Sequence, residues 1–293
     1  MTGQGGGDIL FVRERADGGK AIFLMSDDGR DVRRLVAGDS PRWSPDGTRF
    51  AYYRRLGARS VWVMDLDTGE KRRVVSADAI LAFAWAPDGV RLAYSDGYRI
   101  FIVNTETGDS EPVSIDYAQG RLDWSPDGRK LLLSRQASVK VLDLRTGAER
   151  EIAPRVWVDG GRWSPDGERI ALAEPNYPYN PRRKAFDLPA DGLAKGAIVV
   201  ADRDGGSRER VTGGSAFDSE PAWSEDGERI YSTRQPPLQL FEEAPGESEL
   251  YVVDLETRSL RRLTDTAGID RSPDVRPAHR SLPGPPEPAP GEI

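Results

Sequence analysis

The chain has 293 residues, a net charge of −7 and 38% hydrophobic residues, which is enough to form a sizeable core. Its acidic balance argues against nucleic acid as a partner, because phosphate binding requires a basic stripe. The absence of cysteine excludes disulfides and thiol chemistry, and a single histidine, His279 in a proline-rich tail, argues against zinc sites and a Ser-His-Asp triad.

The N-terminal region begins with residues 1–7, which we expect to be flexible and which have neither the basic region nor the apolar stretch of a signal peptide. As written, the sequence favours a cytoplasmic protein; a trimmed exported protein would be periplasmic or extracellular. The segments 9–12, 21–25 and 32–36 then predict three strands. These three strands lack the fourth strand of a four-stranded unit.

A Trp-Ser-Pro-Asp-Gly phrase occurs five times, twice with one substitution, and organises the middle of the chain. Its tryptophans follow one another at steps of 42, 39, 39 and 60 residues, and they are Trp43, Trp85, Trp124, Trp163 and Trp223. A period of about 40 residues is typical of one four-stranded blade of a β-propeller. Proline and glycine in the phrase predict a tight turn, so each tryptophan is expected to end an inner strand and to lie in the core.

The segment Asp270-Arg271-Ser272-Pro273-Asp274 follows the fifth repeat and contains its Ser-Pro-Asp part, with Arg271 in place of the tryptophan. We interpret it as the strand that is missing from the N-terminal unit. The sequence therefore predicts an all-β, six-bladed β-propeller of four-stranded antiparallel blades over residues 8–275, closed by this pairing. The proline-rich residues 276–293 are expected to be a disordered tail.

The repeat resembles those of the TolB-like six-bladed propellers, a WD40-like repeat family. The likeness rests on the Trp-Ser-Pro-Asp-Gly phrase, a short apolar strand, a strand of the type Val63-Met64-Asp65-Leu66 and a Thr68-Gly69 turn. Residues 41–73 are most similar, and the resemblance covers about residues 8–275. It implies a bacterial protein-interaction module, although such repeats also occur in sensor domains and ahead of serine-peptidase domains.

Polar residues just upstream of the repeat tryptophans are expected to share one face of the propeller, at the mouth of its channel. These candidate binding residues are Asp39, Arg42, Arg121, Asp123, Asp159, Arg162, Asp218, Glu220 and Asp270. Three interpretations stay open: mutual pairing of the channel lining, binding of a ligand or cation, and catalysis by paired carboxylates. No cofactor is expected, and Ca²⁺ is the one candidate ion, with Asp39, Asp159, Asp218 and Asp270 as its donors.

The 60-residue step contains an insertion, and the next repeat has another at the same junction, so the loops 175–196 and 236–248 are expected on the same face. Long loops on a rigid scaffold often bind partners, although tolerated surface insertions are the plain alternative. The candidate residues in these loops are Tyr177, Tyr179, Arg182, Arg183, Phe186 and Phe241.

The favoured function is a non-catalytic binding or protein-interaction propeller that uses the channel mouth and both loops. Its partner would be a protein or a small ligand, and we expect a monomer that binds no nucleic acid. No run of about 18 apolar residues is present, so insertion into a membrane is not expected. The alternatives are a hydrolase or lyase that uses channel carboxylates, and a sensor or accessory domain cut from a larger protein.

Overall fold

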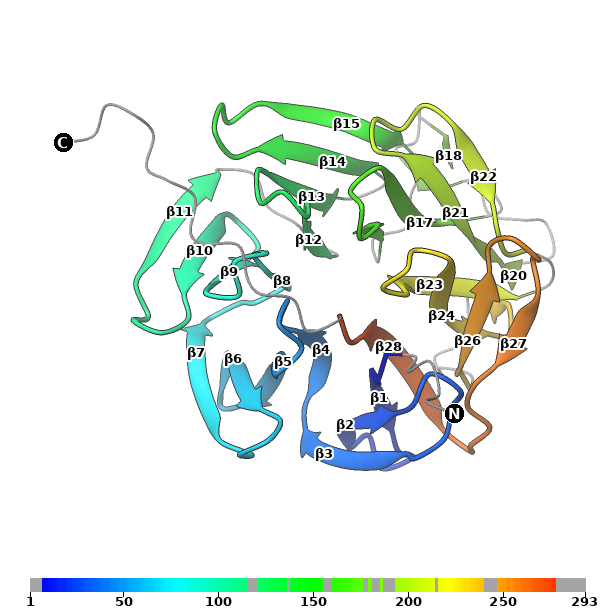
Figure 1. Ribbon diagram of the computed structural model, residues 1–293, viewed down its shortest axis with the longest axis horizontal. Coiled ribbons are helices and arrows are strands. Elements are labelled where there is room, and N and C mark those ends of the chain that lie inside the picture. Colours follow the sequence, from blue (N-terminus) through cyan, green and yellow to red (C-terminus); the bar gives the residue numbers. More distant parts are fainter. Residues whose placement is uncertain are drawn as a thin grey trace, which may run out of the picture.

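The computed structural model describes residues 7–114, 121–135, 138–154, 160–175, 179–180, 185–186, 193–213, 216–239 and 247–277. These residues form strands and turns, and among them there is no helix that could cross a membrane. The sheets surround a common centre (Figure 1). The fold is therefore an all-β propeller with antiparallel four-stranded blades, as the repeat predicts.

Four sheets have four strands each. The first has the order β28–β1–β2–β3, with strands Ile269–Val275, Ile9–Glu14, Lys20–Met25 and Arg33–Ala37. The second has the order β4–β5–β6–β7, with strands Asp39–Trp43, Arg49–Leu56, Ala58–Asp65 and Lys71–Ala77. The third comprises β8 to β11, at Ala82–Trp85, Arg91–Ser95, Ile100–Asn104 and Ser110–Ser114. The fourth comprises β12 to β15, at Leu122–Trp124, Lys130–Arg135, Ser138–Asp143 and Glu149–Pro154.

A further sheet has eight strands and contains two antiparallel runs. One run is β16–β17–β21–β22, at Gly161–Trp163, Arg169–Pro175, Gly196–Asp202 and Arg208–Arg210. The other is β23–β24–β26–β27, at Phe217–Trp223, Arg229–Gln235, Glu249–Asp254 and Leu260–Arg262. The only registered pair between the described parts of the two runs is the parallel pair Gly196 and Phe217, so they are weakly joined.

Both inserted loops contribute short strands. Within the first, β18 (Tyr179–Asn180) pairs with β19 (Ala185–Phe186). Further along, β20 (Leu193–Ala194) pairs with β25 (Leu238–Gln239) of the second insertion. The two insertions are therefore bonded to each other, close to the beginning of β23.

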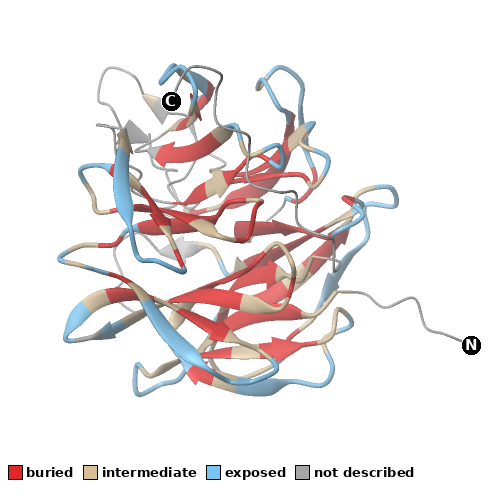
Figure 2. Cartoon of the chain, turned by 60° about the vertical axis from the view of Figure 1, so that its left-hand side comes forward, coloured by how far each residue is buried: buried red, intermediate tan, exposed pale blue. Residues whose placement is uncertain are grey.

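The core lies between neighbouring sheets, where Figure 2 shows the buried inner strands. All five repeat tryptophans are buried, which confirms their prediction as core residues. Trp43, for example, packs in one cluster with Ile22 of the first sheet and Phe50 of its own. Because burial of a tryptophan favours a partner for its indole N–H, two of them donate to the backbone of another inner strand: Trp85 to Arg42 O of β4 (3.1 Å) and Trp223 to Arg162 O of β16 (3.0 Å).

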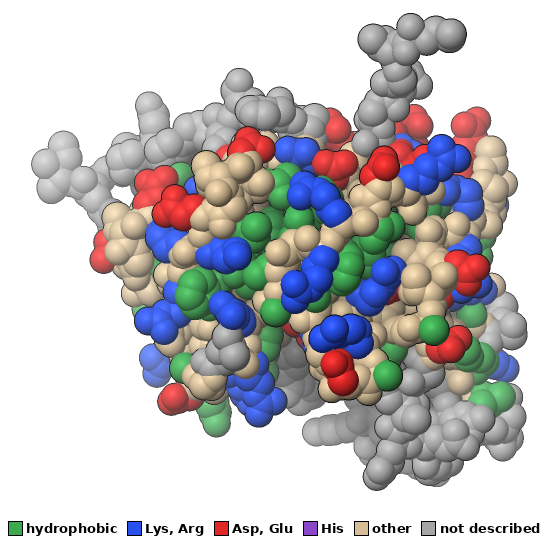
Figure 3. All heavy atoms as spheres, turned by 90° about the horizontal axis from the view of Figure 1, so that it is seen from below, with side chains coloured by type: hydrophobic (Ala, Val, Ile, Leu, Met, Phe, Trp, Pro, Cys, Tyr) green, Lys and Arg blue, Asp and Glu red, His purple; other side chains and the backbone are tan. Residues whose placement is uncertain are grey.

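The outermost strands are polar, and all three residues of both β22 and β27 are exposed. On the face seen in Figure 3, lysine and arginine side chains are interspersed with acidic and hydrophobic ones. The described part of this face therefore has no large area of a single charge.

The pairing of β28 with β1 joins the C-terminal strand to the N-terminal three, with Ile9 opposite Val275 and Val12 opposite Arg271. The predicted alignment of this strand with the repeat is wrong, however. Its Ser272 has φ of 56°, as Ser40 has φ of 51° in β4, and a register shift follows both residues. Val275, and not Arg271, therefore occupies the position of the repeat tryptophan, since Ser272-Pro273 corresponds to Ser40-Pro41.

Candidate functional site

The inner strands β4, β23 and β28 share a bulge that places one residue in the left-handed region. These residues are Ser40, Glu220 and Ser272, with φ of 51°, 54° and 56°, and a proline follows each of them. Such a conformation costs a non-glycine residue about 1–3 kcal/mol and tends to cluster at functional sites. A bulge also redirects the neighbouring side chains of its strand. Three adjacent inner strands are thus modified in the same way at one end of the channel.

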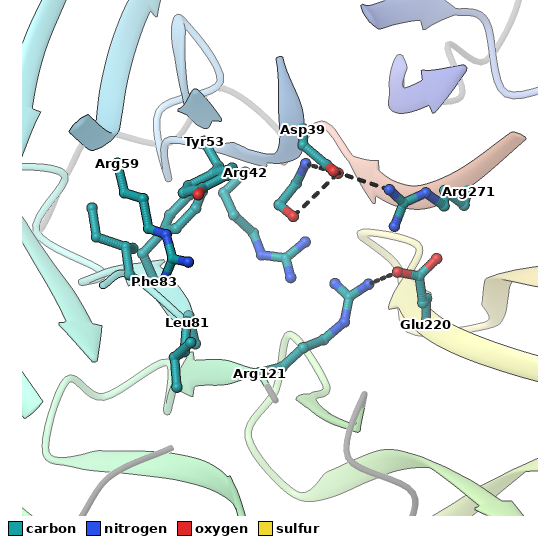
Figure 4. A pocket seen from close by; sticks show the side chains of 12 residues that line it. Asp39, Arg42, Tyr53, Arg59, Leu81, Phe83, Arg121, Glu220 and Arg271 are labelled. Atoms are coloured by element: carbon teal, nitrogen blue, oxygen red, sulfur yellow. Dashed lines mark hydrogen bonds and ion pairs between the residues drawn. The ribbon is translucent and has the colours of Figure 1, made fainter. Parts of the chain in front are cut away.

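A pocket of about 390 Å³ opens beside these bulges (Figure 4). Its lining residues are Asp39, Ser40, Arg42, Tyr53, Arg59, Ile80, Leu81, Ala82, Phe83, Arg121, Glu220 and Arg271. They come from β4, β5, β6, β8, β23 and β28, the segment leading into β8, and the residue before β12. A second hollow of about 490 Å³ shares Asp39 and Tyr53 with it and adds Lys20, Arg54 and Arg55. Arginines and apolar side chains therefore meet at the same pocket.

Glu220 is buried at the inner side of the pocket and accepts bonds from several donors. Arg121 Nη2 lies 2.8 Å from its Oε1, Ser272 donates through N (2.6 Å) and Oγ (2.7 Å), and Thr233 Oγ1 donates at 2.6 Å. Burial opposes its ionisation, but the charges of Arg121 and Arg271 together with these bonds outweigh burial and lower the pKa of Glu220 to about 2. Glu220 is therefore a fixed anion at neutral pH.

Three other predicted carboxylates that the structure describes also lie beside basic side chains. Asp39 accepts a bond from Arg271 Nη2 at 2.9 Å and one from Lys20 Nζ at 3.1 Å. Asp270, which is fully buried, accepts two bonds of 2.7 Å from Arg13. Arg234 Nε lies 3.6 Å from Asp218 Oδ1, and burial raises the pKa of Asp218. Asp218 and Asp270 do not line the pocket.

A network of buried charges adjoins the pocket at the centre of the propeller. Arg162 bonds to Asp123 at 3.1 Å and also to Asp274 of β28. Each of these carboxylates also accepts a hydrogen bond from a backbone N–H group: Trp163 donates to Asp123 at 2.8 Å, and Trp43 donates to Asp274 at 2.7 Å. Burial raises the pKa of Asp123, although the charge of Arg162 opposes this. The network ties three inner strands together.

The structure thus brings four predicted residues, Asp39, Arg42, Arg121 and Glu220, to one pocket and places Asp123 and Arg162 in the adjoining network. Tyr179 and Phe186 are register partners in β18–β19. The remaining predicted residues lie outside the described part of the chain, and they are Asp159, Tyr177, Arg182, Arg183 and Phe241.

Sequence reasoning missed Arg59, Tyr53, Arg271 and the apolar residues 80–83. The signal for Arg271 was available, because the Ser-Pro that follows it matches the Ser40-Pro41 that follows Asp39. Among the described residues, no group of three or more His, Cys, Asp or Glu side chains is placed to hold a metal ion. The three described candidates for calcium donors each lie beside a basic side chain instead.

No protein-family model and no curated protein matches this chain. Among solved structures, TolB from Acinetobacter baumannii aligns with a TM-score of 0.71 and 19% identity, over 92% of this chain and 67% of that chain. A putative TolB from Agrobacterium tumefaciens aligns with a TM-score of 0.62 and 19% identity, over 92% of each chain. An oligogalacturonate lyase in complex with manganese aligns with a TM-score of 0.53 and 16% identity, over 90% of this chain and 75% of that chain. These likenesses show the propeller fold.

Proposed function

We propose that this chain is a non-catalytic propeller that binds a polypeptide at its channel mouth. The observation that carries the proposal is the pocket beside the three bulges, where arginines and a partly exposed apolar rim occur together. Leu81 on that rim is 42% exposed, and Arg59 is half-buried beside it. Protein interfaces typically combine an apolar centre with arginine and tyrosine. The likeness to the TolB structures supports the same function.

The inserted loops 175–196 and 236–248 belong to the proposed binding surface. Their pairing through β20 and β25 and their position next to β23 support this, because β23 contributes Glu220 to the pocket. A loop pair that is bonded together can present side chains at a lower ordering cost than two separate loops.

The proposed propeller has six blades and is closed. The two antiparallel runs of the eight-stranded sheet would count as two blades, in addition to the four separate sheets. Pairing of β28 with β1 would close the ring, because it joins the last described strand to the first. Closure matters for the proposed function, since it brings Arg271 of β28 within 2.9 Å of Asp39 of β4 at the edge of one pocket.

Catalysis by the pocket carboxylates is less favoured. A general base must accept a proton near neutral pH, and Glu220, with a pKa of about 2 and several bonded donors, is a weak base. Asp39 is held between Lys20 and Arg271. The charges around both groups therefore favour a binding role.

Selection from random peptides displayed with free C-termini tests the proposed function. We expect enriched peptides to bind the wild-type protein and to lose at least tenfold in affinity on Leu81→Asp, because the substitution puts an anion on the apolar rim. Leu260→Asp is the matched control: Leu260 is 40% exposed, but it lies on β27 outside the pocket. Failure to enrich any peptide, or equal losses in both variants, would contradict the proposal.

A further inference from the structure

Within the described part of the chain, the buried charges at the centre are three guanidiniums and three carboxylates, and one guanidinium has no hydrogen-bonded carboxylate. Arg162 bonds to both Asp123 and Asp274, and Arg121 forms an ion pair with Glu220. Arg42 is only 6% exposed, yet the single hydrogen bond that its guanidinium makes among the described residues goes to the adjacent Pro41 O at 3.2 Å.

Arg42 also lacks a close ion pair. Its nearest carboxylate oxygen, Asp274 Oδ1, is 3.7 Å from Nη1, and Asp274 is already bonded to Arg162 and to the N–H of Trp43. A buried charge without a hydrogen-bonded counterion is costly, and a further anion that bonds to Arg42 would offset this cost. Burial and the nearby charges of Arg162 and Arg121 lower the pKa of Arg42.

Two N–H donors at the pocket have no partner among the described residues. They are Arg42 Nε and Arg121 Nη1, and both atoms are buried. Both side chains line the pocket, and Figure 4 shows their guanidinium groups pointing toward each other. Two like charges that face each other with free donors form a receptor for an anion.

The residues that line the pocket indicate which kind of anion it would bind. Four arginines and two carboxylates line it, so the net charge of the lining is positive and attracts an anion. A planar carboxylate also matches the planar guanidinium fork. Leu81 and Phe83 line the same pocket and would receive an apolar group close to the anion.

We propose that Arg42 and Arg121 bind the C-terminal carboxylate of a partner polypeptide whose last residue is apolar. In such a residue the carboxylate and the side chain leave the same carbon atom, so both fit a pocket of about 390 Å³. This inference rests on the proposed binding function and specifies its ligand.

Matched small probes test the inference: N-acetyl-L-phenylalanine, its amide, inorganic phosphate and D-galacturonate. Nitrogen-15 spectra of the arginine Nε–H groups provide the readout, because a purely structural Arg42 would not respond to a probe. We expect the acid to shift the Arg42 signal in a saturable way and the amide to bind at least tenfold more weakly. Equal binding of acid and amide, or tighter binding of phosphate or galacturonate, would overturn the inference.

Substitutions in the pocket that leave the protein folded distinguish a loss of binding from a loss of stability. Arg42→Met should abolish acid binding without lowering the melting temperature, since Asp274 keeps its other partners. Arg59→Gln retains the buried network and should lower the affinity for the acid several-fold, because Arg59 lines the pocket. Arg99→Gln is the control and should leave this affinity unchanged, because Arg99 is exposed and lies outside the pocket. A folded Arg42→Met or Arg59→Gln protein that binds the acid like the wild type would refute the inference.

The two proposals fail in different ways. If peptides selected by display bind equally well after amidation of their C-terminus, recognition of the terminal carboxylate is refuted, whereas the proposed binding function is supported. If no peptide is selected at all, the binding function itself is refuted.

Discussion

Arg162 on β16 bonds to Asp274 on β28, although 112 residues separate them in the chain. The same guanidinium bonds to Asp123 on β12 at 3.1 Å. One side chain therefore links three inner strands across the centre of the propeller, and both of its carboxylates accept a second bond from a tryptophan N–H.

Arg162→Met should lower the free energy of unfolding by about 3–5 kcal/mol, because it leaves two buried carboxylates without their cation. Urea unfolding followed by tryptophan fluorescence measures this. Arg203→Met is the control: Arg203 forms an exposed pair with Glu168 at 3.1 Å, and an exposed pair contributes less than about 1 kcal/mol. Similar losses for both variants would show that the central network does not stabilise the fold.

Trp124→Ala should cost about 3–5 kcal/mol, because Trp124 is 4% exposed and the substitution leaves a cavity between two sheets. Calorimetric melting checks the result. Tyr98→Ala removes an aromatic ring that is 78% exposed and should change stability little. A Trp124→Ala protein as stable as the wild type would contradict the assignment of the repeat tryptophans to the core.

Deletion of residues 266–293 should lower the stability by more than about 3 kcal/mol, because it removes β28 and exposes the edge of β1. Deletion of 278–293 leaves every described strand in place and should change the melting temperature little. Identical melting of both truncated proteins would rule out closure of the ring through β28.

Acid should weaken the fold partly through Glu220. Its pKa lies at about 2 in the folded protein, below its ordinary value of 4.5, so its contribution is present above pH 4.5 and is lost as the pH falls toward 2. A shift of this size corresponds to on the order of 3 kcal/mol. Urea unfolding of the wild type and Glu220→Gln between pH 6 and 2.5 measures it. The difference in unfolding free energy between the two proteins should shrink with falling pH. A constant difference would show that Glu220 is not a source of the acid sensitivity.

The sequence predicts the blade pattern well because the same local chemistry recurs. In four of the five repeats the serine, aspartate and glycine form a local turn, as Ser44 and Asp46 do with Gly47 at φ of 67°. The tryptophan precedes this turn and faces a neighbouring sheet. Both features are determined within a few residues, so they can be inferred from one copy and checked on the others.

The candidate site is only partly predictable because it combines residues from strands that are distant in the chain. Asp39, Arg42, Arg121 and Glu220 were found from their place before the repeat tryptophans. Arg59 and Leu81 were not, since nothing in their own segments indicates that they face the centre. The alignment of β28 was mistaken because two different Ser-Pro pairs occur at the first repeat, Ser40-Pro41 in the bulge and Ser44-Pro45 in the turn.

The position of β28 has a consequence for synthesis of the protein. This strand is the last described one to leave the ribosome, and it supplies Arg271, Ser272 and Asp274 to the pocket and to the central network. Until β28 has been synthesised, the edge of β1 that pairs with it stays unpaired. Nascent chains released before codon 271 would therefore carry every repeat tryptophan and still lack an assembled site, so binding competence would report that translation has been completed.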